Sequence, residues 1–275
     1  MLRRIAKSRL LICVVALSAV ASFGASASHT IRIASWNVLN LNKTTPVDER
    51  AEVIAQYDIV ALQEVESLEG LERLRQAVEE RSGVTWKTAA SPKVGEGQAA
   101  EYYAFIYRAD RVSETAGPHG VYPASSSTEF SRPPFYDTFK AGNFDFTLIT
   151  VHITFATPAS RRADEVRRLK QVWIYVHGLE PKEDDLLLMG DFNTNRPTNL
   201  AFDPLRELGL VNLITGDSTT FTTYSTRENR VGSAWYDNIW MDPSHTAAEH
   251  MGSSGIDFNL PALLHERALP TPLSA

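Results

Sequence analysis

Short apolar runs alternate along the chain with stretches in which apolar residues recur every three or four positions. The runs are typical of strands, and several are apolar at every position, which predicts burial on both faces. The spaced stretches predict helices; in the longest, apolar residues from Val166 to Val176 form one stripe, and Gly178 suits the helix end. The predicted strands are 31–37, 58–63, 102–107, 144–153, 186–189 and 235–241, and the predicted helices are 49–57, 68–81 and 160–176.

Two further segments, 91–98 and 117–131, are rich in Gly, Pro and Ser, which is typical of loops. The chain has no internal repeat and no linker-like stretch, so we expect one domain over residues 28–275. With 43% apolar residues, a chain of this length can build an ordinary hydrophobic core. The order of strands and helices predicts a layered α/β fold.

The first 27 residues have the pattern of an export signal. Basic residues precede an apolar run at 10–21 that is short for a membrane span, and small residues at 25–27 suit signal peptidase. We therefore expect a signal peptide at 1–27 and a secreted or periplasmic protein with no stable membrane association after cleavage. The alternative is an uncleaved membrane anchor.

Loss of this segment would change the net charge. The whole chain has 27 Lys+Arg and 33 Asp+Glu; without the four basic residues of the leader the balance is 23 minus 33, or −10. This argues against binding nucleic acid through a long basic surface alone, and suits carboxylates gathered around a hard cation. The single cysteine, Cys13, lies in the leader, so residues 28–275 contain no disulfide, thiolate nucleophile or cysteine zinc site.

The strand predicted at 186–189 runs into Gly190, Asp191, Phe192 and Asn193. Side chains alternate along a strand, so Asp191 and Asn193 would share one side while Phe192 points into the core. A carboxylate and an amide at a strand end can meet a metal, a water or a phosphate oxygen. The alternative is a turn in which both side chains only bond the backbone.

Other predicted strands carry polar residues of the same kind. Asn37 follows the first strand, Glu64 the second, and Asp237 lies in the last. His152 lies in the strand at 144–153, on the face opposite Ile149, Val151 and Ile153. A lone histidine is more often structural, but this one lies near a strand end with polar neighbours.

Together these motifs resemble the endonuclease/exonuclease/phosphatase family, and within it the deoxyribonuclease I-like branch. The resemblance runs from about Ile31 to Asp242 and rests on SWN, a QE pair, a Glu-x-Tyr strand ending in Arg, a strand His, GDFN and YDNI, in this order. It holds through about residue 255 and leaves a divergent tail at 256–275. It implies a four-layer α/β/β/α sandwich, two packed β-sheets covered by helices, with the active site at one edge.

The resemblance also implies roles. Glu64 is expected to be the principal Mg²⁺ ligand, with Asn37 beside it and Mn²⁺ as an alternative metal. Asp191 is expected to orient or deprotonate the attacking water, and Asn193 to hold that water or a phosphate oxygen.

The remaining expected roles concern the phosphate. His152 would face the scissile phosphate and Glu101 would orient His152. Asp237 would support the phosphate end of the site, and Arg132 would contact a phosphate. Mg²⁺ would neutralise the phosphodiester and its leaving oxygen while a carboxylate readies water for in-line attack.

Some positions depart from the deoxyribonuclease I-like pattern. Leu39 and Glu66 stand where that branch has arginines, and Ala99 stands where it has a DNA-stacking tyrosine. Such residues contact grooves and backbone. Their replacement leaves phosphodiester chemistry in place and argues against duplex DNA as the preferred substrate.

The end of the chain departs further. The family pattern ends with Ser-Asp-His, which does not occur after Asp237, and the tail contains three prolines. Without this motif we expect little or no turnover, unless His250 or His265 substitutes.

We therefore expect a secreted, Mg²⁺-dependent phosphodiesterase, with a nuclease of low sequence specificity as the leading reading and nucleic acid as its substrate. Two alternatives stay open: a hydrolase of a phospholipid or small phosphorylated substrate, and a catalytically impaired member that only binds. No protein partner is predicted.

Overall fold

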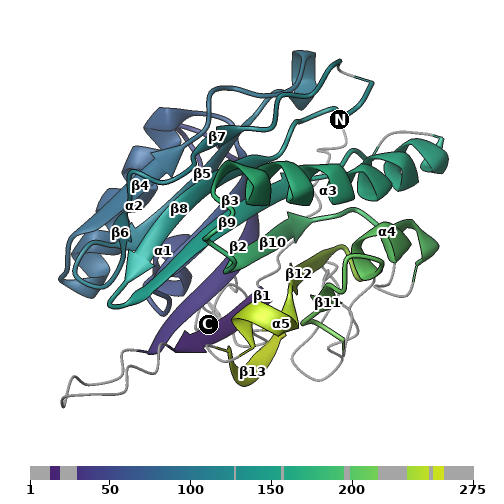
Figure 1. Cartoon of the computed structure of the whole chain (residues 1–275). Helices are drawn as coiled ribbons and strands as arrows, with labels where there is room; N and C mark the ends of the chain where they lie inside the picture. Colours follow the sequence, from purple (N-terminus) through teal and green to yellow (C-terminus); the bar gives the residue numbers. More distant parts are fainter. Residues whose placement is uncertain are drawn as a thin grey trace, which may run out of the picture.

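The protein is a four-layer sandwich in which two β-sheets pack face to face between two layers of helices (Figure 1). The computed structural model describes residues 13–18, 30–126, 128–155, 158–194, 199–215, 234–247 and 250–256. None of the helices in these ranges is long and apolar enough to cross a membrane. The predicted fold class is confirmed.

The first sheet is a mixed sheet with strand order β13-β1-β2-β3-β5-β4. Strand β2 is parallel to β3, and the other neighbours are antiparallel. Its strands are β1 (Cys13–Ser18), β2 (Thr30–Leu41), β3 (Ile59–Val65), β4 (Trp86–Ala90), β5 (Tyr102–Arg108) and β13 (His250–Ile256).

The second sheet has the order β11-β12-β10-β9-β8-β6, with β7 also paired to β8. Strands β9 and β10 are parallel, as expected for neighbours joined by a helical crossover. Its strands are β6 (Ser113–Glu114), β7 (Gly120–Val121), β8 (Phe135–Ala141), β9 (Phe144–His152), β10 (Leu186–Asp191), β11 (Val211–Asn212) and β12 (Asp237–Met241).

Three hydrophobic clusters join the layers. The inner one lies between the sheets and includes Ile33, Phe105 and Leu148. A second packs the outer face of the first sheet against helices α1 and α2, and a third packs β9, β10 and β12 against α3 and α4. The helices are α1 (Asp48–Ile54), α2 (Leu68–Ser82), α3 (Ala159–Leu179), α4 (Asp203–Arg206) and α5 (Pro243–Thr246), with short 3₁₀ turns at Gly97–Ala99 and Leu200–Phe202.

All the predicted strands and helices are present, with ends that move by a few residues. Helix α2 begins where Ser67 accepts a hydrogen bond from the Gly70 backbone N–H and ends at Gly83, whose φ is +71°. The apolar stripe predicted for α3 is its buried face. The prediction missed strands β4, β6, β8, β11 and β13 and the short helices α4 and α5, and the segment 117–131, predicted as loop, contains β7.

Gly190 is required where β10 ends beside β9. Its φ is +140°, and a Cβ there would lie 2.0 Å from the carbonyl oxygen of Val151. Only glycine lets the two backbones approach this closely. This approach sets the register that brings the ends of β9 and β10 together.

The leader segment, left out of the fold prediction, contributes a strand here. Strand β1 pairs with β2 on one side and with β13 on the other. Cleavage after residue 27, which stays a prediction, would remove β1 and leave the backbone of β2 without this neighbour.

Candidate active site

The predicted site residues converge at one edge of the sandwich, on the inner faces of the two sheets. Within the second sheet Asp191 is in register with His152 on β9 and with Asp237 on β12. Residues in register on adjacent strands share a face. On each of the three strands, the site residue points to the same side as the residues that pack between the two sheets. The inner hydrophobic core therefore supports the site.

The backbone is strained here. The non-glycine residues with positive φ among the described positions are Leu39 (51°), Asn40 (52°), Glu64 (61°) and Asn193 (47°). All four lie at the strand ends that form the site, where such strain is often found. By simple alternation Glu64 would share the outer face of Val60 and Leu62. Its positive φ and the register shift after Leu62 instead turn its carboxylate toward Asn37.

Asn37 links the carboxylates of the two sheets. Its Nδ2 donates to Glu64 Oε1 at 2.8 Å and to Asp191 Oδ2 at 3.1 Å, while its Oδ1 accepts from the Leu39 N–H at 3.0 Å. The opposite amide orientation would place oxygen against two carboxylates, so this network assigns the orientation. Asn37 therefore presents nitrogen, not oxygen, to the site. In this arrangement Asn37 positions both carboxylates, and its place beside the metal stays a prediction.

His152 and Glu101 form a buried pair. His152 Nδ1 lies 3.0 Å from both carboxylate oxygens of Glu101, and its Nε2 lies 3.9 Å from Glu64 Oε1 and from Asp191 Oδ2. Burial opposes the charge on each group. The attraction between them outweighs it, so the pKa of Glu101 is lowered and the pKa of His152 is raised. The pair fixes the ring through Nδ1 and leaves Nε2 directed into the site.

Arg132 lies behind this pair. Its guanidinium donates to the carbonyl oxygens of His152 (3.0 Å) and Ile153 (3.3 Å), and Nη1 lies 3.5 Å from Glu101 Oε2. The residue is 8% exposed. These contacts make Arg132 a positioning residue for Glu101 and the end of β9, and the phosphate contact that the resemblance implied stays a prediction.

Asp191 and Asn193 lie on the same side, and Phe192 packs in the outer cluster, as alternation predicts. Asp191 Oδ1 accepts from the Asn193 N–H at 2.8 Å, and Asn193 Nδ2 donates to the Ile153 carbonyl at 2.8 Å. Asn193 Oδ1 is buried and accepts no hydrogen bond. A buried acceptor is costly to leave unpaired, so a water or a ligand hydrogen is its expected partner.

The donor set fits a magnesium ion held by one carboxylate. Glu64 is the most open of the four acidic groups, with a side chain that is 17% exposed. Its Oε2 accepts from the Asn40 backbone N–H at 3.1 Å and, with the Asn40 amide in its satisfied orientation, from Asn40 Nδ2 at 3.3 Å. No group of three or more His, Cys, Asp or Glu residues suited to a metal occurs within the described ranges. Mg²⁺ commonly takes one or two carboxylates and keeps several waters, so Glu64 alone meets this requirement.

Two supporting residues were missed. Gln63 is fully buried and donates to Ser35 Oγ and Thr150 Oγ1, at 3.1 Å and 2.9 Å, which ties the two sheets together beneath the site. Glu165 is also fully buried and accepts the N–H groups of Ser131 and Thr154, at 2.9 Å and 3.0 Å. Both residues could have been found from the sequence, because each is a polar residue within an otherwise apolar strand or helix face.

Two histidines, His250 and His265, were predicted as possible substitutes for the missing Ser-Asp-His histidine. His250 pairs in register with Leu17, which faces Ile31 at the start of β2. Asn37 lies further along the same strand, on the order of 20 Å away at 3.3 Å per residue. His250 therefore lies at the wrong end of the sheet. His265 and the tail from 257 lie outside the described residues.

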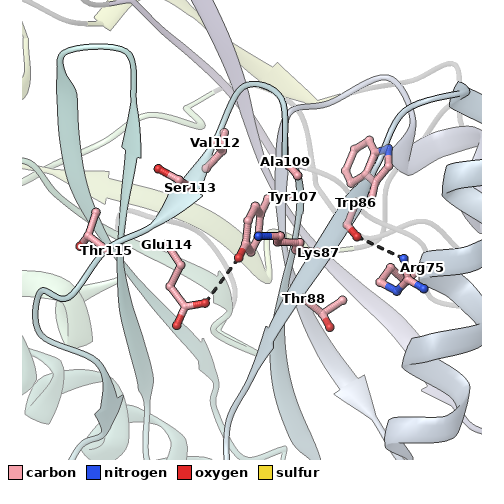
Figure 2. Close-up of a pocket in the computed structure, with 10 residues that line it drawn as sticks. All are labelled: Arg75, Trp86, Lys87, Thr88, Tyr107, Ala109, Val112, Ser113, Glu114 and Thr115. Carbon is pink, nitrogen blue, oxygen red and sulfur yellow. Dashed lines mark hydrogen bonds between the residues drawn. The ribbon is translucent and has the colours of Figure 1, made fainter.

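A cavity of about 690 Å³ lies away from this edge, beside β4 and β6 (Figure 2). Arg75, Lys87, Tyr107 and Glu114 are among its lining residues, and none of the predicted site residues lines it. Figure 2 shows the Tyr107 hydroxyl donating to Glu114, a 3.4 Å contact. A smaller cavity of about 140 Å³ is lined by Asn193 and so adjoins the strand ends.

The comparisons identify the family. The model of the endonuclease/exonuclease/phosphatase family matches residues 34–254. The chain is 31% identical over 271 residues to a deoxyribonuclease of Thioalkalivibrio sp. (strain K90mix), covering 97% of this chain and 70% of the relative. It is 28% identical to human deoxyribonuclease gamma over 59% of this chain and 56% of the relative. The match thus spans little more than half the length of that human relative.

Solved structures agree on the fold. The mannosyl-6-phosphatase Bt3783 of Bacteroides thetaiotaomicron VPI-5482 aligns with a TM-score of 0.57 at 19% identity, over 77% of this chain and 85% of that one. The chain belongs to the endonuclease/exonuclease/phosphatase family, and its deoxyribonuclease relatives place it in the deoxyribonuclease I-like branch. The predictions of the family and of a hydrolase acting on phosphodiester bonds are confirmed.

Proposed function

We propose that the protein is an exported, Mg²⁺-dependent nuclease of low sequence specificity. The observation that carries this is the arrangement at one sheet edge: Asp191 Oδ2 and Glu64 Oε1 each lie 3.9 Å from His152 Nε2. A carboxylate for water, a carboxylate for a cation and a protonated ring for the phosphate thus face a common point. The deoxyribonuclease relatives support nucleic acid as the substrate.

Each residue has a distinct task in this proposal. Glu64 holds Mg²⁺, which when bound neutralises the phosphate and stabilises the leaving oxygen. Asp191 accepts a proton from water as the water oxygen attacks phosphorus and the bond to the leaving oxygen breaks. Asn193 Oδ1, which accepts no hydrogen bond from the described residues, accepts one from that water.

The buried pair completes the reaction. His152 Nε2–H donates to an oxygen of the phosphate as negative charge develops there. Glu101, held by Arg132, raises the pKa of the His152 ring and fixes its direction. Asp237, in register with Asp191, closes the phosphate end of the site.

The positions that depart from the branch pattern predict a weak preference for duplex. Leu39 and Glu66 lie at the site's edge, and Glu66 accepts from Asn42 Nδ2 at 3.2 Å, so neither of these two positions offers a cation for a backbone phosphate. The net charge, −6 for the whole chain and 23 minus 33, or −10, without residues 1–27, also weakens general attraction to nucleic acid.

The test is hydrolysis of plasmid DNA, a single-stranded oligonucleotide and methyl 4-nitrophenyl phosphate, each with Mg²⁺ and with EDTA. The proposal requires Mg²⁺-dependent cleavage of an oligonucleotide, lost in Asp191→Asn and kept in Asp164→Asn, an exposed acid on α3. Cleavage of the small diester without cleavage of either nucleic acid would favour the small-substrate alternative. Metal binding with no turnover on any substrate would favour the impaired alternative.

Export has a separate test. Expression with the leader should yield protein outside the cytoplasm whose first residue is Ser28. An intact N-terminus in the membrane fraction would instead support an uncleaved anchor.

A further inference from the structure

An exposed aromatic side chain stands beside the strand ends. Phe155 follows β9 by three residues, and it is 49% exposed, the one aromatic among the exposed large hydrophobic residues of the described ranges. Its ring lies 6.0 Å from that of Tyr236, edge to face at 66°. Tyr236 directly precedes Asp237, so this aromatic pair adjoins the proposed phosphate end of the site.

A cation lies over one ring of this aromatic pair. The Arg162 guanidinium carbon lies 4.8 Å from the centre of the Phe155 ring, which is cation–π distance. Arg162 comes from the first turns of α3 and is half-buried. Proteins bind single-stranded nucleic acid with aromatic side chains on which bases stack and with positive charges that contact the backbone.

Phe155, Tyr236 and Arg162 are called the platform below. A cavity lies between the platform and the strand ends that carry the candidate active site. The cavity of about 140 Å³ is lined by Arg162, Tyr236, Asn193, Thr194 and Asn199. Its volume is close to the roughly 150 Å³ that accommodates one benzene ring in an engineered apolar cavity. Asn193 lines this cavity and also belongs to the catalytic edge, and Thr194 and Asn199 are its other polar lining residues from the same segment. The cavity therefore offers polar groups for the edge of a flat ring.

The platform is held in place by the fold. The segment after β9 is fixed by Glu165, which accepts the Thr154 N–H at 3.0 Å, and by Asn193, which donates to the Ile153 carbonyl. The Tyr236 carbonyl accepts the Phe192 N–H at 2.6 Å. A fixed platform loses little conformational entropy when a ligand binds.

We propose that Phe155, Tyr236 and Arg162 form a subsite for the nucleotide that flanks the scissile phosphodiester. An unpaired base stacks at Phe155, and Arg162 attracts the adjacent phosphate. This inference rests on the proposed nuclease function and names its substrate class: single-stranded nucleic acid, because a base within a duplex is already stacked and cannot reach the platform.

The experiment measures binding and cleavage separately. The full chain and its variants are titrated in EDTA, by fluorescence anisotropy, into labelled oligothymidylate, an abasic oligomer of equal length and a duplex. Cleavage of the same oligomers is then followed with Mg²⁺. The variants are Phe155→Ala and Arg162→Gln. Their controls on α3 are Ile174→Ala, an exposed apolar residue, and Arg167→Gln, which pairs with Asp164.

Phe155→Ala should weaken binding of oligothymidylate about 5- to 100-fold, as for one lost stacking contact, and leave the abasic oligomer unaffected. Arg162→Gln should weaken both oligomers and reduce the salt dependence of binding. Both controls should match the wild type. Equal effects of Phe155→Ala on the two oligomers, no effect on either, or tighter binding of duplex by the wild type would overturn the subsite.

The two proposals fail in different ways. If the wild type binds oligothymidylate through Phe155 but cleaves nothing with Mg²⁺, the subsite stands and the nuclease function falls. If it cleaves both oligomers at the same rate with and without Phe155, the nuclease function stands and the subsite falls.

Discussion

Replacement of Gly190 by alanine tests how closely β9 and β10 must approach. A methyl group there would lie 2.0 Å from the Val151 carbonyl oxygen and 2.9 Å from that residue's carbonyl carbon, atoms of backbone that cannot rotate away. The φ of +140° adds strain of about 1–3 kcal/mol for any residue with a Cβ. Relief requires the strands to separate, so we expect a loss of at least about 3 kcal/mol in the free energy of unfolding.

The assay is urea unfolding followed by circular dichroism. The variant's midpoint should fall by roughly 1 M or more, from the expected loss divided by a slope of about 3 kcal/mol/M. Gly178→Ala is the control, because a Cβ at Gly178 meets nothing within 4 Å and alanine favours the helix. A Gly190→Ala protein within about 1 kcal/mol of the wild type would refute the close approach and the register drawn from it.

Three further predictions follow from the site and its surroundings. Glu64→Gln should weaken Mg²⁺ binding at least about tenfold by calorimetry, because a carboxylate charge is lost; unchanged affinity would reject Glu64 as the ligand. Arg132→Lys should lower the melting temperature and leave KM unchanged, since lysine cannot reproduce the two carbonyl contacts; a raised KM at unchanged stability would restore a phosphate contact. Burial, then Glu114, raises the pKa of Asp137 to about 7. The native state thus keeps a proton that the unfolded chain loses near pH 4, and stability falls as pH rises from about 4 to 7. Asp137→Asn should be neutral near pH 4 and stabilising at pH 8, by at most about 4 kcal/mol; equal pH profiles would contradict this.

The pattern of apolar residues predicted those strands and helices that are buried on one face or on both faces. Strands such as β9 and β10 are continuous apolar runs and helix α3 has a clear stripe, so their positions could be read directly. Strand β8 was missed because Asp137 and Thr138 interrupt its apolar pattern. Both are buried there, and Thr138 Oγ1 lies 2.9 Å from Thr147 Oγ1 on β9. Partners distant in sequence make those polar residues acceptable inside.

The site, too, could be predicted only in part. Polar residues at strand ends predicted which side chains meet, because the ends of neighbouring strands share one edge. The direction of each group was not predictable: Glu64 is turned by a positive φ, and the Asn37 amide is oriented by the Leu39 N–H. Arg132 was assigned by resemblance, whereas its partners are carbonyls of residues 152 and 153, which only the folded chain brings near.

The most direct test of the account is cleavage of a single-stranded oligonucleotide by the purified chain and by Asp191→Asn. Asp191 is 3% exposed and faces His152, so its isosteric replacement removes the proposed proton acceptor with little change in packing. We predict Mg²⁺-dependent cleavage that EDTA abolishes and that is slow because the Ser-Asp-His motif is absent. The variant should reduce this rate by a further 10²- to 10⁴-fold, roughly, at a similar melting temperature. Cleavage that survives EDTA, or a variant that cleaves as fast as the wild type, would contradict it.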